Sequence, residues 1–281
     1  LFGTTVGFIN NIVTKFGIEV SHVSPTDVDE WKAAVKANTK LLFLETPSNP
    51  LGEVADLEAL AELAHSIGAL LVVDNSLLSP VGSQPLKHGA DISVSSATKA
   101  IDGHGRVMGG VLAGSEELMT QVAVYCNSCG LAMSPFNAWQ LLSGVETLSL
   151  RMEKQFDNAL KIAQWLQAQP QVQAVYYTGL PDHPQAELIR KQQNGGGIVI
   201  GFEVADTDAA WKIVDSVELF SRTANLGDVR STITHPWTTT HGRMQPEEKL
   251  AANIRPGLVR LSVGLEYVDD LIDDLKQALA R

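Results

Sequence analysis

Two continuous apolar runs with a helix-like segment between them constrain the fold of this chain more than any other feature. The runs KLLFLE and ALLVVD, at residues 40–45 and 69–74, show no alternation of polar and apolar side chains, which is typical of strands buried on both faces of a parallel sheet. Between them DLEALAELAHSIG has helical period, with Asp56 as its N-cap and Gly68 just past its end. The order strand, helix, strand predicts a parallel α/β unit.

The same series continues and then changes character. ADISVSS and MGGVLAG read as further strands, and from about Pro135 a long pattern of helical period runs to Pro170. Beyond it VQAVYY, GIVIGFEV and LVRLSVG read as strands, and TDAAWKIVDSV and YVDDLIDDLKQAL as helices. We therefore expect an α/β fold with a mostly parallel sheet in a large domain at residues 1–146. A smaller C-terminal α+β domain at residues 147–281 includes the long connecting helix.

Composition excludes several classes of function. The chain has 281 residues, 44% of them hydrophobic and 19% charged, and a net charge of −11, so it belongs to the globular class. No cluster of Lys and Arg offers a surface for nucleic acid or an anionic membrane. Its apolar runs are too short to cross a bilayer and its start does not resemble a signal peptide. We expect a cytoplasmic protein with a small-molecule substrate.

The two cysteines form the spacing CNSC at Cys126 and Cys129. A tetrahedral zinc site needs two more ligands, and the distant His235 and His241 have no helix-like spacing that would provide them. The pair also falls inside a predicted helix rather than at a strand-to-helix turn, which argues against a redox dithiol. We expect no metal site.

Polar residues gather where the predicted strands end. Ligands of open parallel sheets bind outside the carboxyl ends of the strands, and there the sequence places Asn49, Asp74, Ser96, Thr98 and Lys99. A structural ion pair between the carboxylate and the lysine is the simpler interpretation. The alternative is a catalytic site that uses both.

The residue types favour pyridoxal phosphate. That cofactor requires a lysine amine for a Schiff base, a carboxylate that keeps its pyridine nitrogen protonated, and donors for its phosphate. Lys99, Asp74 and the hydroxyls of Ser96 and Thr98 provide these groups. The sequence does not match the dinucleotide-binding motif G-x-G-x-x-G, because Met108 occupies the position of its third glycine.

Four motifs in order resemble a known family. ETPSNP, VVDNSLLSP, SSATK followed by GHGR, and VRLSVGLE are similar to the signatures of the cystathionine γ-synthase-like family of pyridoxal-phosphate enzymes of Cys and Met metabolism. The resemblance covers essentially the whole chain. It implies a fold type I, aminotransferase-like architecture and a homotetramer built from two dimers.

The resemblance implies a role for each rim residue. Lys99 is similar to the Schiff-base lysine, Asp74 to the partner of the pyridine nitrogen, and Asn49 to the residue near the ring hydroxyl. Ser96 and Thr98 are similar to the family's phosphate ligands.

Two further residues follow from the same resemblance. Arg260 matches the arginine that holds the substrate α-carboxylate, a task suited to its bidentate fork. Phe2 falls where most members have a tyrosine stacked on the cofactor ring. A phenyl ring can stack but cannot exchange a proton, so that part of the family's acid-base chemistry is not expected here.

Departures from the common pattern place the chain near one branch. GHGR with Arg106, NLGD with Asn225, and THPWTTTHGR resemble the O-succinylhomoserine sulfhydrylase branch. Arg106 and Asn225 are expected on the substrate side, with Arg106 holding the distal carboxylate of a succinylated substrate. The alternative for Arg106 is a loop arginine paired with an acid.

The resemblance implies a γ-replacement that converts O-succinyl-L-homoserine and sulfide to L-homocysteine and succinate in methionine biosynthesis. Cystathionine γ-synthase and the cystathionine and methionine lyases share all the cofactor residues, so they remain alternatives. A non-catalytic homologue or an inactive fragment is an alternative of another class. Because the sequence opens at Leu1 without a methionine, we also expect that an N-terminal segment, which in the family contacts the neighbouring subunit's phosphate site, is absent from it.

Overall fold

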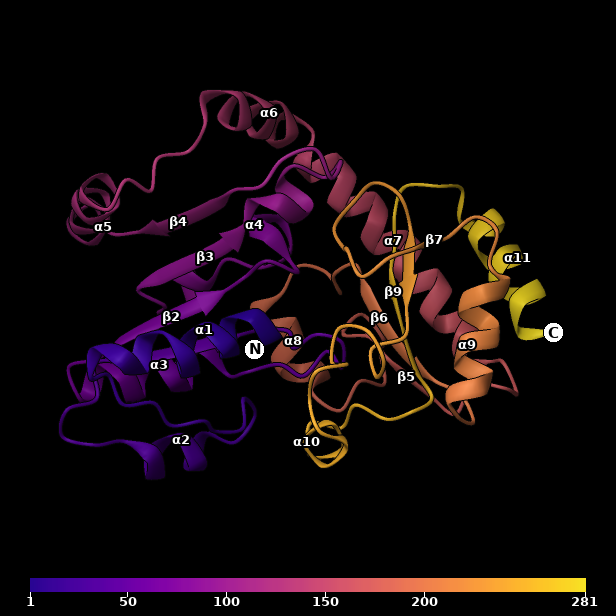
Figure 1. Ribbon diagram of the computed structural model, residues 1–281, viewed down its shortest axis with the longest axis horizontal. Coiled ribbons are helices and arrows are strands. Elements are labelled where there is room, and N and C mark those ends of the chain that lie inside the picture. Colours follow the sequence, from indigo (N-terminus) through magenta and orange to yellow (C-terminus); the bar gives the residue numbers. More distant parts are fainter.

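The computed structural model describes all residues from Leu1 to Arg281 and contains two separate sheets (Figure 1). The first has the strand order β1-β2-β3-β4. Its strands are β1 Leu41–Glu45, β2 Leu70–Asp74, β3 Ile92–Ser96 and β4 Gly110–Gly114. β1, β2 and β3 are parallel, which confirms the mostly parallel α/β sheet, whereas β4 runs antiparallel to β3 at the edge.

Nine helical segments accompany this sheet. They are α1 Gly3–Asn11, the 3-10 turn η1 Val13–Phe16, α2 Val28–Ala34, α3 Leu57–Ser66, α4 Ser79–Gly82, the 3-10 turn η2 Pro85–His88, the π-helical turn η3 Ala97–Ile101, α5 Glu116–Ser128 and α6 Pro135–Glu146. The predicted helix with Cys126 is α5, and both cysteines are free thiols.

Helix α3 begins and ends where the sequence predicts. The Asp56 carboxylate accepts a hydrogen bond from the Ala59 amide at 3.1 Å, as an N-cap does. Gly68 follows the helix with a φ of 68°, a left-handed conformation that favours glycine. Leu57 and Leu60 are fully buried in the core under β1 and β2, and each such side chain stabilises the fold by about 1.5–3 kcal/mol.

The long helical pattern after Pro135 forms two helices instead of one. α6 ends at Glu146, and α7 Leu148–Gln167 begins after Thr147, whose φ of −113° and ψ of 7° are not helical. Apolar period alone cannot locate such a break, because both helices have the same period.

The second sheet has the order β5-β6-β9-β8-β7. Its strands are β5 Ala174–Tyr176, β6 Val199–Glu203, β7 Ser221–Arg222, β8 Thr232–Thr234 and β9 Leu258–Ser262; its helices are α8 Ala186–Gln192, α9 Thr207–Ser216, α10 Pro246–Ala251 and α11 Val268–Leu279. Only β7 and β8 pair in parallel. The predicted strands and helices after Pro170 are present, and the sequence did not predict β7, β8, α8 and α10.

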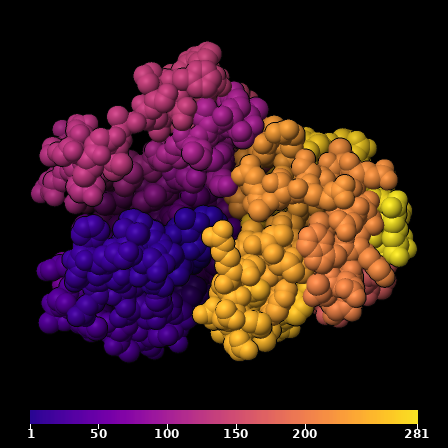
Figure 2. Space-filling view, in the orientation of Figure 1, coloured from indigo at the N-terminus to yellow at the C-terminus, as the bar shows by residue number.

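The largest core lies between this sheet and the helices α7, α9 and α11. Figure 2 shows the two halves of the chain side by side, indigo to magenta on one side and orange to yellow on the other. The division into domains at residues 146 and 147 stays a prediction, since α7 buries its C-terminal half in the second core. No helix is both long and apolar enough to cross a membrane.

Candidate active site

The carboxyl ends of β1, β2 and β3 bring the predicted rim together. Glu45 and Asp74 end neighbouring parallel strands as register partners, and Ser96 ends the next strand. Lys99 follows three residues later, in the turn η3. The β-α-β order of the sequence is sufficient to place these side chains on one edge of the sheet.

Ser76 links two of these strand ends. Its hydroxyl donates to Asp74 Oδ1 at 2.6 Å and accepts from the Ser96 amide at 2.7 Å. The Ser76 amide also donates to Asp74 Oδ1, at 3.0 Å. Asp74 Oδ2 has no hydrogen-bond partner in the chain, so one carboxylate oxygen is fixed and the other is available.

Lys99 contacts an amide instead of a carboxylate. Its Nζ donates to Asn225 Oδ1 at 2.9 Å. The simpler interpretation of the sequence required an ion pair between Lys99 and Asp74, and the structure contains no such pair. The backbone of Lys99, with φ −90° and ψ −128°, leaves the helical region inside the turn. Burial lowers the pKa of the Lys99 amine, and the Arg260 guanidinium lowers it further, so more of the amine is neutral at a given pH.

Arg260 lies on β9 and is 3% exposed. Its Nη2 donates to the Ala224 carbonyl at 2.7 Å, and its Nη1 makes a long contact of 3.4 Å with Asn49 Oδ1. No carboxylate of the chain pairs with it, and burial lowers the pKa of Arg260 to about 10. A buried guanidinium without an acid is suited to a carboxylate brought by a ligand.

Asn225 joins the two cations of the site. Its side-chain oxygen accepts from Lys99, and its backbone carbonyl lies 3.5 Å from Arg260 Nη2. The structure therefore brings together Lys99 and Asn49 from the first half of the chain with Asn225 and Arg260 from the second.

Phe2 is anchored beside the strand ends through its backbone. The Phe2 amide donates to Glu45 Oε2 at 2.6 Å, while the residue itself is 53% exposed. Burial, with a contribution from Asp74, raises the pKa of Glu45 to about 7. Phe2 thus lies next to the Glu45 and Asp74 pair, and its ring-stacking role stays a prediction.

The two predicted phosphate ligands differ in their contacts. The Thr98 hydroxyl accepts from the Gly109 amide at 3.1 Å and contacts the Gly109 carbonyl at 3.4 Å. The Ser96 hydroxyl has no partner in the chain, so it is the freer donor of the two.

Arg106 is engaged within its own loop. Its Nε donates to the fully buried carboxylate of Asp102 at 2.9 Å, and its Nη2 contacts the Gln140 carbonyl at 3.4 Å. None of its polar contacts is with Lys99 or Arg260. This is the ion pair of the alternative interpretation, and the substrate role of Arg106 stays a prediction. His104 Nδ1 donates to the Asp102 carbonyl at 2.8 Å.

The sequence did not identify Ser76 as a site residue. A Ser two residues after an Asp at a strand end is typical of an Asx turn, so VVDNS did contain a signal. The sequence did not single out His241 as a site residue; burial lowers its pKa and the Arg260 guanidinium lowers it further, so His241 lies in the surroundings of that guanidinium.

The available groups fit pyridoxal phosphate. The half-buried Lys99 amine without an acid partner, the free oxygen of Asp74 and the free hydroxyl of Ser96 are the donor and acceptor types that the cofactor requires. Arg260 adds a buried cation for a substrate carboxylate.

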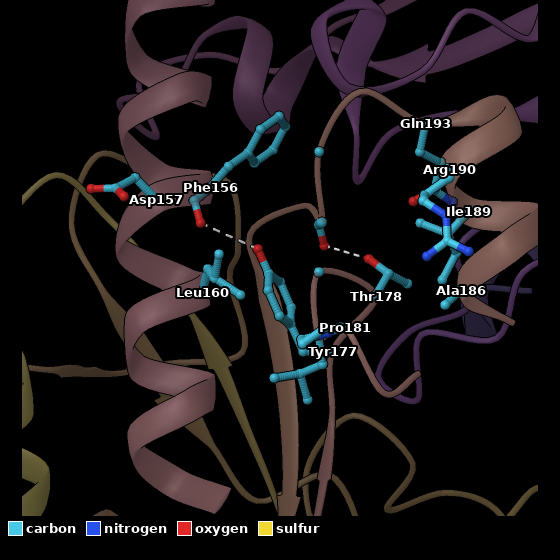
Figure 3. Close-up of a pocket in the computed structure, with 14 residues that line it drawn as sticks. Phe156, Asp157, Leu160, Tyr177, Thr178, Pro181, Ala186, Ile189, Arg190 and Gln193 are labelled. Atoms are coloured by element: carbon cyan, nitrogen blue, oxygen red, sulfur yellow. Dashed lines mark hydrogen bonds between the residues drawn. The ribbon is translucent and has the colours of Figure 1, made fainter. Parts of the chain in front are cut away.

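A separate cavity of about 450 Å³ lies between α7, α8 and the segment after β5 (Figure 3). Phe156 and Leu160 extend from α7 on one side, and Ile189, Arg190 and Gln193 lie on the other. None of the predicted site residues lines it, so it is distinct from the Lys99 site.

Comparisons with known proteins identify a family. Residues 1–280 match the family described as Cys/Met metabolism PLP-dependent enzyme. The chain is 50% identical over 281 residues to the O-succinylhomoserine sulfhydrylase of Pseudomonas aeruginosa, which covers 100% of this chain and 70% of that protein. It is 42% identical over 283 residues to the L-methionine gamma-lyase of Porphyromonas gingivalis, covering 99% of this chain and 71% of that protein.

A solved structure shows the same fold. The crystal structure of cystathione gamma lyase from Micromonospora echinospora superimposes with a TM-score of 0.96 at 35% identity, covering 100% of this chain and 74% of that one. The fold type I architecture expected from the sequence is therefore confirmed.

Proposed function

The chain belongs to the Cys/Met metabolism PLP-dependent enzyme family, and on that premise we propose that it converts O-succinyl-L-homoserine and sulfide to L-homocysteine and succinate. Its cofactor is pyridoxal phosphate. The observation that supports this reaction most is the 50% identity, along the whole chain, with the sulfhydrylase of Pseudomonas aeruginosa. This reaction makes the protein a transferase of methionine biosynthesis.

The chain's own groups divide the binding tasks. Lys99 would hold the cofactor covalently, Asp74 would hold its ring nitrogen, and Ser96 and Thr98 would hold its phosphate, with Asn49 and Phe2 beside the ring. When bound, pyridoxal phosphate supplies an aldehyde that takes up the substrate amine and a ring that stores electrons.

Arg260, Asn225 and Lys99 position the substrate and transfer protons. Arg260 binds the substrate α-carboxylate with its buried fork. Asn225 accepts a hydrogen bond from Lys99 and thereby orients the amine. Lys99, partly neutral because burial and Arg260 lower its pKa, removes the proton at Cα and moves protons at Cβ.

The reaction balances without a further reactant. The bond between Cγ and the succinyl oxygen breaks and succinate leaves, a bond between Cγ and sulfur forms, and the protons that Lys99 removed return to carbon. Arg106 is proposed to attract the distal carboxylate of the succinyl group. Replacement of Arg106 by Ala with no change in the KM of succinylated substrate would refute that role.

A lyase is the second candidate. The 42% identity with an L-methionine gamma-lyase supports elimination to a keto acid, and the cofactor residues would be the same. Cystathionine γ-synthase, with cysteine in place of sulfide, is a further candidate of the same kind.

The test is an assay of the purified chain with pyridoxal phosphate and O-succinyl-L-homoserine, with and without sulfide, in which homocysteine and keto acid are measured together. Sulfide-dependent homocysteine, absent in Lys99→Ala, supports the proposal. Keto acid formed equally with and without sulfide would assign a lyase instead. The visible absorption of lysine-bound cofactor is recorded alongside, and its absence from the unmodified chain would indicate a non-catalytic protein.

We also propose that the protein assembles as a homotetramer. α1 and α5 bury none of their residues within the chain. Large apolar side chains are exposed on them and on α6, among them Phe8 at 56%, Tyr125 at 65% and Trp139 at 63%. Exposed apolar surface of this extent is typical of a protein interface. A cytoplasmic location stays a prediction.

A further inference from the structure

Arg151 is a buried cation of α7 that lies directly behind the turn of Lys99. The residue is 5% exposed, and no carboxylate forms an ion pair with it. Burial lowers its pKa, and the nearby Asp102 opposes that shift. Asp102 itself is bound to Arg106, and the Arg151 guanidinium donates through Nε to the Thr147 hydroxyl at 3.1 Å and otherwise to backbone carbonyls.

Three carbonyls accept from this guanidinium. Nη1 donates to the Ala100 carbonyl at 2.7 Å, and Nη2 donates to the carbonyls of Ile101 at 3.2 Å and Gly144 at 2.7 Å. Ala100 and Ile101 are the two residues that follow Lys99. Hydrogen bonds from a charged donor are stronger than those between neutral groups, so this contact stabilises the turn.

The turn needs an external support because Lys99 itself is not helical. Two backbone bonds enclose the turn, from Asp102 to the Ala97 carbonyl at 2.9 Å and from Gly103 to the Lys99 carbonyl at 2.8 Å. The Ala100 and Ile101 carbonyls point instead at Arg151. The turn that carries the Lys99 amine is therefore hydrogen-bonded to a side chain from another helix.

Two glycines make room for this approach. A Cβ on Gly103 would clash with Arg151 Nη1, and a Cβ on Gly144 would clash with the Ile101 carbonyl oxygen. Gly103 also has a φ of 68°. Both positions exclude larger residues, so the close packing of Arg151 on the turn is built into the fold.

The same helix face also contacts the loop that carries Asn225, the partner of Lys99. Gln155, one turn after Arg151, donates to the Asp228 carbonyl at 3.0 Å. Asp228 follows Gly227, and a Cβ on Gly227 would lie 2.9 Å from Lys99 Cβ. α7 thus supports both the lysine turn and the loop of Asn225.

We propose that Arg151 is a positioning residue for Lys99: its guanidinium fixes the turn Ala97–Ile101 so that the amine stays half-buried against Asn225. The proposal rests on the proposed role of Lys99. Arg151 touches neither substrate nor cofactor and acts only through the backbone of the turn.

The test measures how fast the full chain, freed of cofactor, takes up pyridoxal phosphate as a function of pH. In Arg151→Met the turn relaxes and the Lys99 amine becomes more hydrated, so its pKa rises and the uptake profile moves up by about 0.5 pH units or more. With cofactor bound, kcat falls by about 10-fold or more while KM changes less, because the amine is misplaced. Arg151→Lys keeps the charge with fewer donors and gives intermediate values.

Asn158→Ala is the matched control. Asn158 lies on the same helix and donates to the Gly264 and Glu266 carbonyls at 3.1 and 3.0 Å, away from the Lys99 turn. It should lower Tm without moving the uptake profile. The proposal fails if Arg151→Met and Asn158→Ala lower Tm alike and neither moves the profile. If Arg151→Met does not fold, an unchanged profile in Arg151→Lys refutes the proposal.

Lys99→Ala separates this proposal from the proposed function. If Lys99→Ala still acquires the absorption of lysine-bound cofactor, the role of Lys99 is wrong and the proposal for Arg151 falls with it. If that absorption is lost in Lys99→Ala and the profile of Arg151→Met is unchanged, only the positioning role fails.

Discussion

Lys99 and Arg260 are two basic side chains of one site with an amide between them, and no carboxylate pairs with either. The Asn225 side chain accepts from the amine, and its backbone carbonyl lies next to the guanidinium. Each cation is destabilised by burial, so the site favours a neutral amine and an anionic ligand at the same time. Both conditions are required by a lysine that transfers protons next to a substrate carboxylate.

Replacing Arg260 by Lys is expected to lower kcat/KM for the amino-acid substrate by about 10- to 100-fold, mainly through KM, because a point charge replaces a bidentate fork. Steady-state kinetics at saturating sulfide measure this. Arg230→Lys is the control, since Arg230 is an exposed residue paired with Asp228 at 3.2 Å and should change little. A kcat/KM within twofold of the unmodified chain would exclude Arg260 as the carboxylate ligand.

Glu45 predicts a pH dependence of stability. Burial and Asp74 raise its pKa from 4.5 to about 7 in the folded chain, so the folded state binds a proton that the unfolded state releases. The stability from this proton is fully present below pH 4.5 and is lost as the pH rises through about 7. Glu45→Gln, which resembles the protonated form, should be more stable than the unmodified chain at pH 8 by about 1–3 kcal/mol.

Urea unfolding without added cofactor at pH 5 and pH 8 checks this expectation. At pH 5, close to the unfolded pKa of 4.5, the difference between the two proteins should be much smaller than at pH 8. Glu187→Gln, at an exposed position of α8, is the control and should leave both values unchanged. An equal difference between Glu45→Gln and the unmodified chain at both pH values would contradict the assignment.

Site residues that directly follow a predicted strand could be identified from the sequence. Asp74, Ser96 and Lys99 were predicted because the ends of parallel strands share one edge. The bond between Lys99 and Asn225 joins residues 126 positions apart, and no local pattern encodes such a pairing. Arg151 was not predicted either, because its partners are backbone carbonyls, which every residue has.

At the scale of elements, helix boundaries set by side chains were the most predictable. The N-cap at Asp56 and the glycine after α3 are local chemical signals that the structure confirms. The break between α6 and α7 was not predicted, because the apolar period is the same in both helices. The Gly144 carbonyl near the break bonds to Arg151, and the apolar pattern does not encode such a contact. The antiparallel direction of β4 was not predicted either, because apolar spacing does not encode strand direction.

Replacing Asp56 by Ala should lower the free energy of unfolding by about 1 kcal/mol, because the Ala59 amide loses its acceptor at the start of α3. The midpoint of urea unfolding measures the loss, and kcat should be unchanged. Glu62→Ala, at an exposed position of the same helix, is the control. A loss in the control as large as in Asp56→Ala would mean that helix propensity, and not the cap, accounts for the effect.

At the scale of the whole molecule, most of the exposed large apolar side chains lie in residues 1–150. Leu131, Phe136, Trp139 and Leu142 are all more than half exposed, on α6 and just before it. In Figure 1, α5 and α6 lie on the far side of the four-stranded sheet from α1, α2 and α3. We assign this face to contacts between copies of the chain.

A charge at the centre of this face should separate the copies. Trp139→Glu is expected to convert the assembly to a smaller species in sedimentation velocity, because an unpaired carboxylate would be buried at the contact. Leu219→Glu places the same charge at a side chain that is 42% exposed in the second half and should leave the mass unchanged. An unaltered sedimentation coefficient for Trp139→Glu would show that α6 is not at the contact.

The face of α7 that holds Arg151, Gln155 and Asn158 also limits how this chain can change in length. The first and last of these side chains are seven positions apart along the helix, a rise of about 10 Å, and each end is hydrogen-bonded to a different half of the molecule. Inserting or deleting one residue between them would rotate one end by about 100° relative to the other. Substitutions on the outer face of residues 151–158 are compatible with both contacts, but the number of residues between Arg151 and Asn158 is fixed by them.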